Sequence, residues 1–377
     1  MSITSRERLL AVLHREVPDS VPVCPDISNM VPARLTGKPF WDIYVYKDPP
    51  LWKAHIDALK FFDIDGGFEV YDFGDLFGDA EERWEDQIVH RYDDGRFVTQ
   101  TMNLDTGEWS RHVRVHTADN PPATNVLPSK IGLSAEPQTW EAISGVKEWP
   151  TGLELWKLVQ EEMGDQGIVG MPSGASTLLV RDPEEIYAYY DDPKPFFERR
   201  ERMIEHVTRR METISRLEVK PDFLLCGSSG SLVFQSPSIF RELALPVLKH
   251  VTELAYDIGI PTHVHSCGPE KDLVKMAAEE TQLTIVDPLE IPPMGDCDLA
   301  ELKRLYGSKI TLKGNLHTTQ VMLRGSVDDV VAASKQAIDD AGAGGGFVLS
   351  TGDQCGRDTP DENIRAMVET ARTYGRY

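Results

Sequence analysis

The feature that most constrains the fold of this chain is a regular alternation of short apolar runs and longer helical segments from about residue 150 onward. The runs have the length and composition of buried strands and occupy residues 167–171, 223–226, 262–265, 283–286, 310–312 and 347–350. Segments with helical character separate them, among them 195–217, 237–258, 269–279 and 327–341. Strands that alternate with helices in this way form a parallel sheet with helical crossovers.

The predicted fold class is α/β, and a closed (β/α)8 TIM barrel is favoured over an open sheet. No G-x-G-x-x-G loop follows any of the predicted strands, which argues against a dinucleotide-binding fold. The length of 377 residues suits one such barrel. The sequence contains no linker, internal repeat or low-complexity stretch, so we predict a single domain over residues 1–377.

The N-terminal part of the chain predicts additional elements. Thr4 and Glu7 form a capping-box pattern that opens a helix through about Arg15, and the apolar run 21–24 predicts a strand. Asp48 is the predicted cap of a helix that reaches Phe62, with two prolines in its first turn. Residues from about 85 to 117 alternate polar and apolar positions around two Asp- and Gly-containing turns, which predicts an antiparallel β-meander inserted into the barrel.

The charge of the chain excludes some partners. Lys plus Arg is 39 and Asp plus Glu is 61, so the formal net charge is −22. Such a surface repels phosphate backbones and anionic lipids, so we expect no nucleic-acid or membrane partner. The acidic surface keeps the protein soluble or, alternatively, binds a basic protein partner or a cationic substrate. No apolar stretch approaches a membrane span and the N-terminus lacks a signal-peptide pattern, so we expect a cytoplasmic protein.

Candidate functional residues follow the predicted strands, where (β/α)8 barrels carry their active sites. They are His265, Cys267, Glu290, His317 and Cys355. His265 and Cys267 stand two positions apart in extended chain and therefore share a face. Zinc binds His, Cys and Glu side chains and, in catalytic sites, keeps one position open for substrate or water.

The alternative is that these side chains are structural. A buried cysteine usually behaves as a small apolar residue, and an isolated His-x-Cys pair is common. The odd number of five cysteines in a chain of this length argues against a disulfide framework and favours metal binding or catalysis. His317 is predicted to support a ligand or contact substrate, whereas the remaining candidates are predicted to be core or surface residues: His263, Cys24, Cys226 and Cys297.

The chain resembles the uroporphyrinogen decarboxylase superfamily, and within it the zinc methyltransferases of corrinoid-dependent methyl transfer. The segments that carry the resemblance are spread over nearly the whole chain and comprise 6–9, 19–23, 236–240, 245–246, 313–316 and 359–364. The methyltransferase branch is marked by His-x-Cys-Gly and a distant Cys before a Thr-Pro-x-Glu-Asn segment, which His265, Cys267, Gly268 and Cys355 match. The resemblance implies one zinc ion on His265, Cys267 and Cys355.

The resemblance also bears on Glu290. Related cobalamin-independent methionine synthases add a Glu ligand some two dozen residues after the Cys, and Glu290 follows Cys267 by 23 residues (290 − 267). Glu290 is therefore predicted to be a fourth zinc ligand that substrate displaces or, alternatively, a residue that orients a neighbouring ligand. Glu290 and His317 are the predicted catalytic side chains.

The decarboxylase branch fits less well. Its Arg-Gln-Ala-Gly-Arg motif corresponds to residues 26–34 here, where Arg34 is the single arginine, and its Gly-Asn-Leu-Asp-Pro becomes Gly-Asn-Leu-His-Thr at 314–318. The resemblance thus implies a methyltransferase that demethylates a small methoxy, methylamine or methylthio compound onto a corrinoid protein. The corrinoid (cobalamin) comes in trans, because the sequence lacks the Asp-x-His-x-x-Gly corrinoid-binding motif.

Three other functions stay open. The enzyme could move the methyl group from methylcobamide to a thiol, or it could be a uroporphyrinogen-type decarboxylase. From a different class, it could be a metal-binding or regulatory barrel without turnover. The sequence also leaves a homodimer open.

Overall fold

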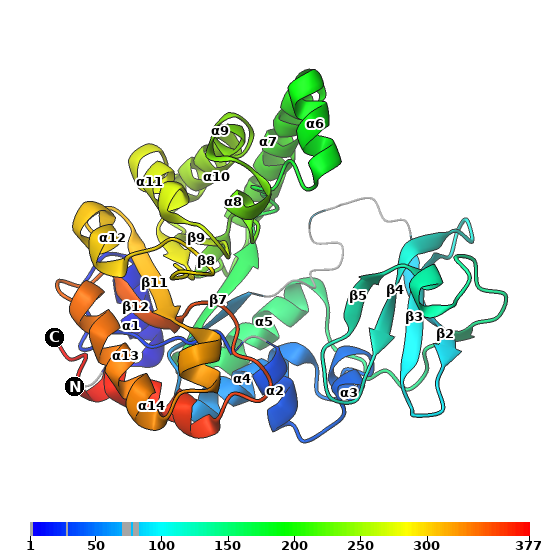
Figure 1. The fold of residues 1–377 in the computed structure, drawn as a ribbon, viewed down its shortest axis with the longest axis horizontal. Helices are drawn as coiled ribbons and strands as arrows, with labels where there is room; N and C mark the ends of the chain where they lie inside the picture. The colour runs from blue at the N-terminus through cyan, green and yellow to red at the C-terminus, as the bar shows by residue number, and fades with distance from the viewer. Residues whose placement is uncertain (1–2, 28, 70–76, 78–82) are drawn as a thin grey trace.

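The computed structural model describes residues 3–27, 29–69, 77 and 83–377, and its centre is a curled sheet of seven parallel strands (Figure 1). The strands follow one another around the sheet in the order β1-β7-β8-β9-β10-β11-β12. Their bounds are β1 (Gly66–Glu69), β7 (Gly167–Pro172), β8 (Phe223–Leu225), β9 (Thr262–His265), β10 (Ile285–Asp287), β11 (Thr311–Leu316) and β12 (Phe347–Thr351). Because all neighbours are parallel, their carboxyl ends meet at one rim of the sheet.

The two edges of this sheet approach each other at the apolar segment 21–24. Val23 forms a parallel bridge with Leu349 of β12, and its carbonyl accepts a hydrogen bond of 2.9 Å from the backbone N–H of Asp65, directly before β1. The α/β class and the curled parallel sheet are thereby confirmed. The predicted eight-stranded barrel is confirmed in part. Seven of the eight positions around the sheet are strands, and the eighth is the segment 21–24, which pairs with β12 through a single β-bridge.

Helices cover the outside of the sheet, as Figure 1 shows. The longer ones are α1 (Ser5–Leu13), α4 (Leu51–Phe62), α5 (Gly152–Met163), α6 (Pro183–Asp191), α7 (Lys194–Ser215), α10 (Leu245–Asp257), α11 (Lys271–Glu280), α12 (Leu299–Tyr306), α13 (Val327–Ala341) and α14 (Asp361–Thr373). Shorter ones are α2 (Met30–Leu35), α3 (Phe40–Tyr44), α8 (Ser231–Phe234), α9 (Pro237–Ile239), η1 (Pro128–Ile131), η2 (Gly164–Gln166), η3 (Phe240–Ala244) and η4 (Thr318–Leu323). In the described part of the chain, none is both long and apolar enough to cross a membrane.

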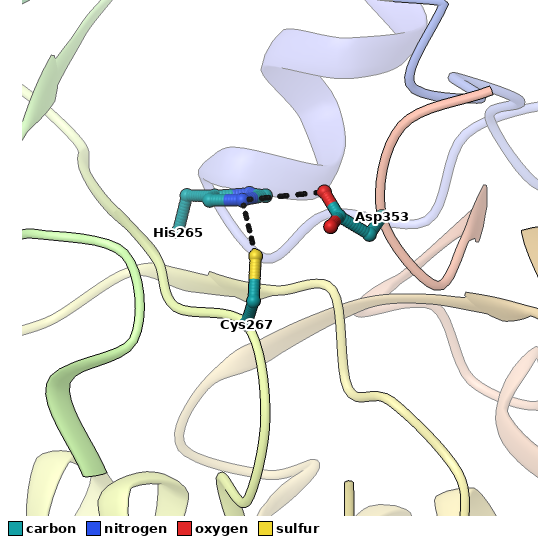
Figure 2. A group of neighbouring side chains, drawn as sticks. All are labelled: His265, Cys267 and Asp353. Atoms are coloured by element: carbon teal, nitrogen blue, oxygen red, sulfur yellow. Dashed lines mark hydrogen bonds and ion pairs between the residues drawn. The ribbon is translucent and has the colours of Figure 1, made fainter. Parts of the chain in front are cut away.

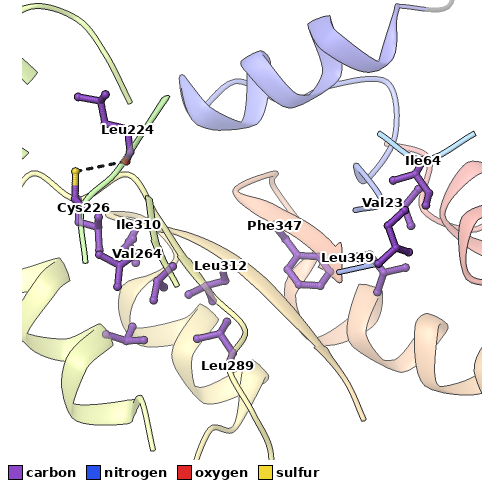
Figure 3. Packing of buried hydrophobic residues seen from close by; sticks show 14 of the residues in the cluster. Val23, Ile64, Leu224, Cys226, Val264, Leu289, Ile310, Leu312, Phe347 and Leu349 are labelled. Atoms are coloured by element: carbon purple, nitrogen blue, oxygen red, sulfur yellow. Dashed lines mark hydrogen bonds between the residues drawn. The ribbon is translucent and has the colours of Figure 1, made fainter. Parts of the chain in front are cut away.

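Alternation along the strands divides their side chains between two environments. Val264, Leu312 and Leu349 are fully buried in the main core that the outer helices complete (Figure 3). Their neighbours in the same strands point to the other face. There, Leu9 and Leu13 of α1 pack with apolar residues from the interior side of the sheet, namely Ile168, Phe223, Ile285 and Val348. Helix α1 therefore closes the interior at the end opposite the carboxyl rim.

A second sheet of five antiparallel strands stands beside the first, in the order β5-β4-β3-β2-β6. Its strands are β2 (Trp84–Arg91), β3 (Phe97–Asn103), β4 (Trp109–His116), β5 (Ala123–Val126) and β6 (Glu141–Ala142). Gly95 and Gly107 take the left-handed φ values of 89° and 74° that its two predicted turns require. The predicted meander is confirmed, and it extends past residue 117 through β5 and β6.

Two local predictions at helix ends differ from the structure. Asp48 does not cap α4, because the helix begins at Leu51 after Pro50. The Asp48 carboxylate instead forms ion pairs with Lys38 and Lys147. The predicted helix 237–258 is divided by the π-helical turn η3 between α9 and α10. Such turns accommodate an extra residue within a helix.

Candidate metal centre

Three potential metal ligands converge at the carboxyl rim of the parallel sheet (Figure 2). His265 is the last residue of β9, Cys267 follows it by two residues, and Asp353 lies in the turn after β12. One ligand atom from each lies within 4.8 Å of the other two. Nε2 of His265 is 3.3 Å from Sγ of Cys267 and 3.8 Å from Oδ1 of Asp353.

These separations fit a zinc ion. With Zn–N near 2.0–2.1 Å and Zn–S near 2.3 Å, tetrahedral ligand atoms lie about 3.4–3.6 Å apart, close to the observed distances. One imidazole, one thiolate and one carboxylate are a donor set that zinc accepts, and three protein ligands leave the fourth position open. Asp353 has a φ of 104°, a backbone conformation that non-glycine residues rarely adopt and that recurs at functional sites.

The orientation of His265 is set by a buried carboxylate behind it. Its Nδ1 lies 3.0 Å from Oδ1 of Asp287, the last residue of β10, which stands beside His265 in the strand register. A carboxylate bonded to Nδ1 fixes the tautomer, turns Nε2 toward a metal and makes it more basic. Consistent with this, burial lowers the pKa of His265, but the attraction of Asp287 outweighs burial and raises the pKa well above the usual value.

Asp287 is itself part of a charged network. Its Oδ1 also lies 2.8 Å from Nε2 of His263, and its Oδ2 accepts a hydrogen bond of 2.5 Å from Nζ of Lys313. Burial opposes ionisation of this carboxyl, but Lys313 and the two histidines hold its pKa well below the usual range. The network therefore keeps a negative charge directly behind His265.

The Cys267 side chain is half-buried and stands next to β8. The hydroxyl of Ser229 donates a hydrogen bond of 3.0 Å to its Sγ, and the backbone N–H of Cys267 donates one of 3.4 Å to Ser229 Oγ. These two hydrogen bonds hold the Cys267 sulfur in position beside His265.

Cys355, the third ligand that the sequence predicts, lies outside this group. Its side chain is fully buried, and its backbone N–H donates a hydrogen bond of 2.7 Å to the carbonyl of Asp26. Burial raises the pKa of the Cys355 thiol to about 12, which disfavours the thiolate. The turn after β12 instead presents Asp353, two residues earlier. A ligand role for Cys355 remains a prediction that requires this turn to rearrange.

Glu290 and His317 are also outside the group but close to it. Glu290 is 6% exposed, and its Oε2 accepts a hydrogen bond of 2.6 Å from the backbone N–H of Gly268, next to Cys267. His317 caps η4, with Nδ1 accepting hydrogen bonds from the backbone N–H groups of Thr319 and Gln320. Together with Asp353 both residues line a small cavity of about 90 Å³. Glu290 thus orients the turn that carries Cys267. Metal binding by Glu290 remains a prediction, and so does a catalytic role for Glu290 and His317.

A larger cavity of about 700 Å³ occupies the interior of the parallel sheet. His265 and Ser229 line it from the metal side, and Leu9 and Leu13 of α1 line its deep end. Its lining also includes residues from the N-terminal segments, among them Asn29, Tyr44, Trp52 and Trp149. Sequence analysis did not predict these residues, because they come from separate segments without a shared motif.

Comparison with known proteins agrees with this architecture. The model of the uroporphyrinogen decarboxylase (URO-D) family matches residues 154–374, which is more than half of the chain. The chain therefore belongs to the uroporphyrinogen decarboxylase family.

Two curated relatives show partial similarity. The methylcobamide:CoM methyltransferase of Methanosarcina mazei is 28% identical over 137 residues, covering 36% of this chain and 37% of the relative. The uroporphyrinogen decarboxylase of Anaeromyxobacter dehalogenans is 29% identical over 155 residues, covering 40% and 42%. The matched region thus spans about two fifths of each relative.

A solved structure extends the likeness over the whole fold. A methyltransferase from Methanosarcina mazei superimposes with a TM-score of 0.59 and 19% identity, covering 99% of both chains. This similarity establishes a shared fold that includes the N-terminal elaboration.

Proposed function

We propose that the protein is a zinc-dependent methyltransferase that exchanges a methyl group between a small molecule and a corrinoid held by a separate protein. The observation that carries the proposal is the convergence of His265, Cys267 and Asp353 at the carboxyl rim, with Asp287 behind His265. This arrangement occurs in a chain of the uroporphyrinogen decarboxylase family that is similar to a methylcobamide:CoM methyltransferase.

Each residue of the site has a definite task in this proposal. His265, Cys267 and Asp353 would hold the zinc ion, which when bound supplies a Lewis acid for the heteroatom that gains or loses the methyl group. Asp287 holds the imidazole in place, Ser229 positions the Cys267 sulfur by a hydrogen bond, and Glu290 fixes the turn after Cys267. The 700 Å³ cavity beside His265 would hold the small molecule with its methyl group facing the rim.

We favour demethylation of a methylated compound onto the corrinoid, because the cavity provides room for a donor of considerable size. The reverse direction, transfer from methylcobamide to a thiol, is the second candidate, because the relative from Methanosarcina mazei is named a methylcobamide:CoM methyltransferase. A thiol acceptor would approach the group of His265, Cys267 and Asp353, where a bound zinc ion would supply a Lewis acid for its sulfur.

Uroporphyrinogen decarboxylation is the less favoured alternative on grounds of charge. A porphyrinogen with several carboxylates needs several cationic partners. Among the described residues that line the cavity, the basic side chains other than histidine are Lys47 and Lys313, and Lys313 is already paired with Asp287. Asp26 and Asp287 add negative charge to the same lining.

The test combines a metal assay with a methyl-transfer assay. The purified chain should contain about one zinc per molecule, and with a Co(I) corrinoid protein and a panel of methoxy, methylamine and methylthio compounds it should form methyl-Co(III), seen by the cobalt absorbance change. Starting from methyl-Co(III) and a thiol tests the second candidate. Release of carbon dioxide from uroporphyrinogen by the metal-free protein, without methyl transfer in either direction, would contradict the proposal.

A further inference from the structure

One carboxylate at the metal end of the larger cavity has no partner. Asp26 lies two residues after the segment 21–24, is half-buried, and lines the cavity together with His265 and Ser229. Among the described residues, none forms a hydrogen bond or an ion pair with its carboxylate. Both carboxylate oxygens retain accessible surface, because neither is among the fully buried side-chain atoms without a partner. Asp26 therefore presents an unpaired negative charge to the occupant of the cavity.

Two backbone hydrogen bonds fix Asp26 beside the metal group. Its N–H donates a hydrogen bond of 3.0 Å to Oγ1 of Thr351, and that hydroxyl donates one of 2.7 Å to the carbonyl of Asp353. The carbonyl of Asp26 accepts a hydrogen bond of 2.7 Å from the N–H of Cys355, on the other side of Asp353. Asp26 is thus held against the turn that carries Asp353, within electrostatic reach of His265.

The lysines of the cavity lining do not neutralise Asp26. Nζ of Lys313 is hydrogen-bonded to Asp287 at 2.5 Å instead. No ion pair joins Asp26 to Lys47, the other lysine of the described lining. Burial raises the pKa of the Asp26 carboxyl to about 6, although the charge of His265 opposes this rise. The carboxyl is therefore ionised at pH 7.5, in surroundings that do not compensate its charge.

An unpaired carboxylate in such surroundings favours a positively charged ligand. Removing a carboxylate from water is costly unless a cation or several N–H groups bind it, and an ammonium group supplies both a charge and hydrogen-bond donors. An anionic ligand would instead add a negative charge next to Asp26 and Asp287. The formal net charge of −22 acts in the same direction, because it attracts cations to the protein and repels anions.

The positive group of the ligand must differ from the atom that carries the methyl group. In the proposed function a Lewis acid acts on a lone pair of that atom. An ammonium nitrogen has no lone pair, whereas an ether oxygen or a thioether sulfur does. Asp26 and His265 line the same cavity, so one molecule can present a cation to the first and an ether or thioether to the second.

We infer that the small molecule of the proposed function is a cation whose ammonium group binds Asp26, while a methyl-bearing oxygen or sulfur of the same molecule faces His265. The inference rests on the proposed function and adds the charge of its substrate.

The transfer from such a donor is balanced. The bond between the methyl carbon and the oxygen or sulfur breaks, Co(I) supplies the electron pair and becomes methyl-Co(III), and the oxygen or sulfur takes a proton from water. The ammonium group is unchanged by the reaction.

Compounds of nearly equal size and different charge test the inference on the zinc-loaded full-length protein, without any corrinoid. The methoxy set is 2-methoxyethylamine, 1-methoxypropane and methoxyacetate, which at pH 7.5 are a cation, a neutral molecule and an anion. The methylthio set consists of the corresponding sulfur compounds. By titration calorimetry we expect the cation of at least one set to bind about tenfold more tightly than its neutral counterpart, because a hydrogen bond to a charged group replaces a methyl contact. The anions should give no saturation at the same concentrations.

Substitution assigns the preference to one carboxylate. Asp26→Asn keeps the size of the side chain and removes its charge, so the cation and the neutral compound should bind within about twofold of each other. The affinity for the neutral compound should stay as in wild type. Asp57→Asn removes an equal charge from α4, where the side chain is 53% exposed, and should keep the wild-type preference. Because the Asp26 carboxylate has no partner, Asp26→Asn should not lower the melting temperature.

The outcomes separate the inference from the function beneath it. Equal affinities for the cation and the neutral compound in both sets, no binding in either set, or an unchanged cation preference in Asp26→Asn would overturn the inference. Methylation of Co(I) from a neutral donor, without a preference for the cations, would overturn the inference and leave the proposed function standing. Binding of the cations through Asp26 with no methyl transfer in either direction from any compound would instead remove the proposed function.

Discussion

The two sheets of this protein bury polar groups in different ways. At the rim of the parallel sheet the buried groups are ionised and paired: Asp287 contacts Lys313, His263 and His265, and its pKa lies well below the usual range. Inside the antiparallel meander, Thr99 and His116 are equally buried, but burial lowers the pKa of His116 to about 4, which keeps its imidazole neutral.

The difference indicates where function lies. Neutral hydrogen bonds such as the 2.9 Å contact between Thr99 Oγ1 and His116 Nε2 satisfy buried groups at little cost and support the packing of the meander. A buried charged network is expensive to desolvate and often stabilises less than apolar residues of the same size. The charged network behind His265 is therefore better explained by a role in metal binding than by a contribution to stability.

The largest expected effect follows from removing the thiolate at the rim. Cys267→Ala should abolish zinc binding and lower methyl transfer at least about a hundredfold, because a metal contributes several kcal/mol to such reactions. The half-buried Cys267 side chain is not part of the main core, so the free energy of unfolding in the absence of metal should change by less than about 1 kcal/mol. Atomic absorption and the cobalt assay measure the first effects, and urea unfolding the last.

A matched control distinguishes this thiol from a buried one. Cys297→Ala removes a thiol that is 3% exposed and outside the metal group. It should keep the zinc and lose stability instead. Full zinc content in Cys267→Ala would show that the rim does not bind the metal as proposed.

The next effect tests the charged network itself. Asp287→Asn should weaken zinc binding about 10–100-fold, because the residue that orients a histidine ligand is altered. It should also destabilise the fold by about 3–5 kcal/mol, because Lys313 keeps a buried charge without its partner. Zinc titration with a competing chelator and urea unfolding measure the two effects.

Asp222→Asn is the matched control for this prediction. The Asp222 side chain is 9% exposed, against 3% for Asp287, and pairs with Arg6 away from the rim. Its substitution should reduce stability and leave zinc affinity unchanged. If both variants bind zinc as wild type does, the network is structural and the contrast between the two sheets loses its functional meaning.

The smallest effect belongs to the meander and depends on pH. The unfolded chain protonates His116 near pH 6.5, whereas the folded meander excludes the proton until about pH 4. The free energy of unfolding is therefore highest above pH 6.5 and falls as the pH drops from 6.5 to 4. Between pH 7 and pH 5 we expect it to fall by about 2 kcal/mol. Hydrogen exchange of the β3 and β4 amides at several pH values measures this loss.

Substitution isolates the histidine responsible. His116→Gln should flatten this pH dependence, while the exposed His14→Gln should retain the wild-type slope. An unchanged slope in His116→Gln would mean that the buried imidazole does not control the acid response of the meander.

Much of the architecture could be predicted from the sequence because strands and turns leave local patterns. The run 262–265 coincides with β9, and the two turns of the meander need glycine at positive φ. Strand β1 was missed because its sequence, Gly-Gly-Phe-Glu, has no apolar run. His265 and Cys267 were predicted as a pair because two positions in extended chain share a face.

The rest of the site depends on geometry that no local pattern encodes. Asp353 lies next to His265 because the turn after β12 takes a left-handed backbone conformation at this residue, and a sequence motif cannot show which side chain of a turn faces inward. The lining of the larger cavity includes Asn29, Tyr44, Trp52 and Trp149, which belong to four separate segments. Only the folded chain brings them together.

The central claim is that zinc is held by His265, Cys267 and Asp353, and two variants in one turn test it most directly. Zinc content should be about one per chain in wild type and in Cys355→Ala, whose thiol is buried away from the group, and should fall to a small fraction of that in Asp353→Ala. The opposite pattern, with zinc lost from Cys355→Ala and retained by Asp353→Ala, would contradict the account and make Cys355 the third ligand.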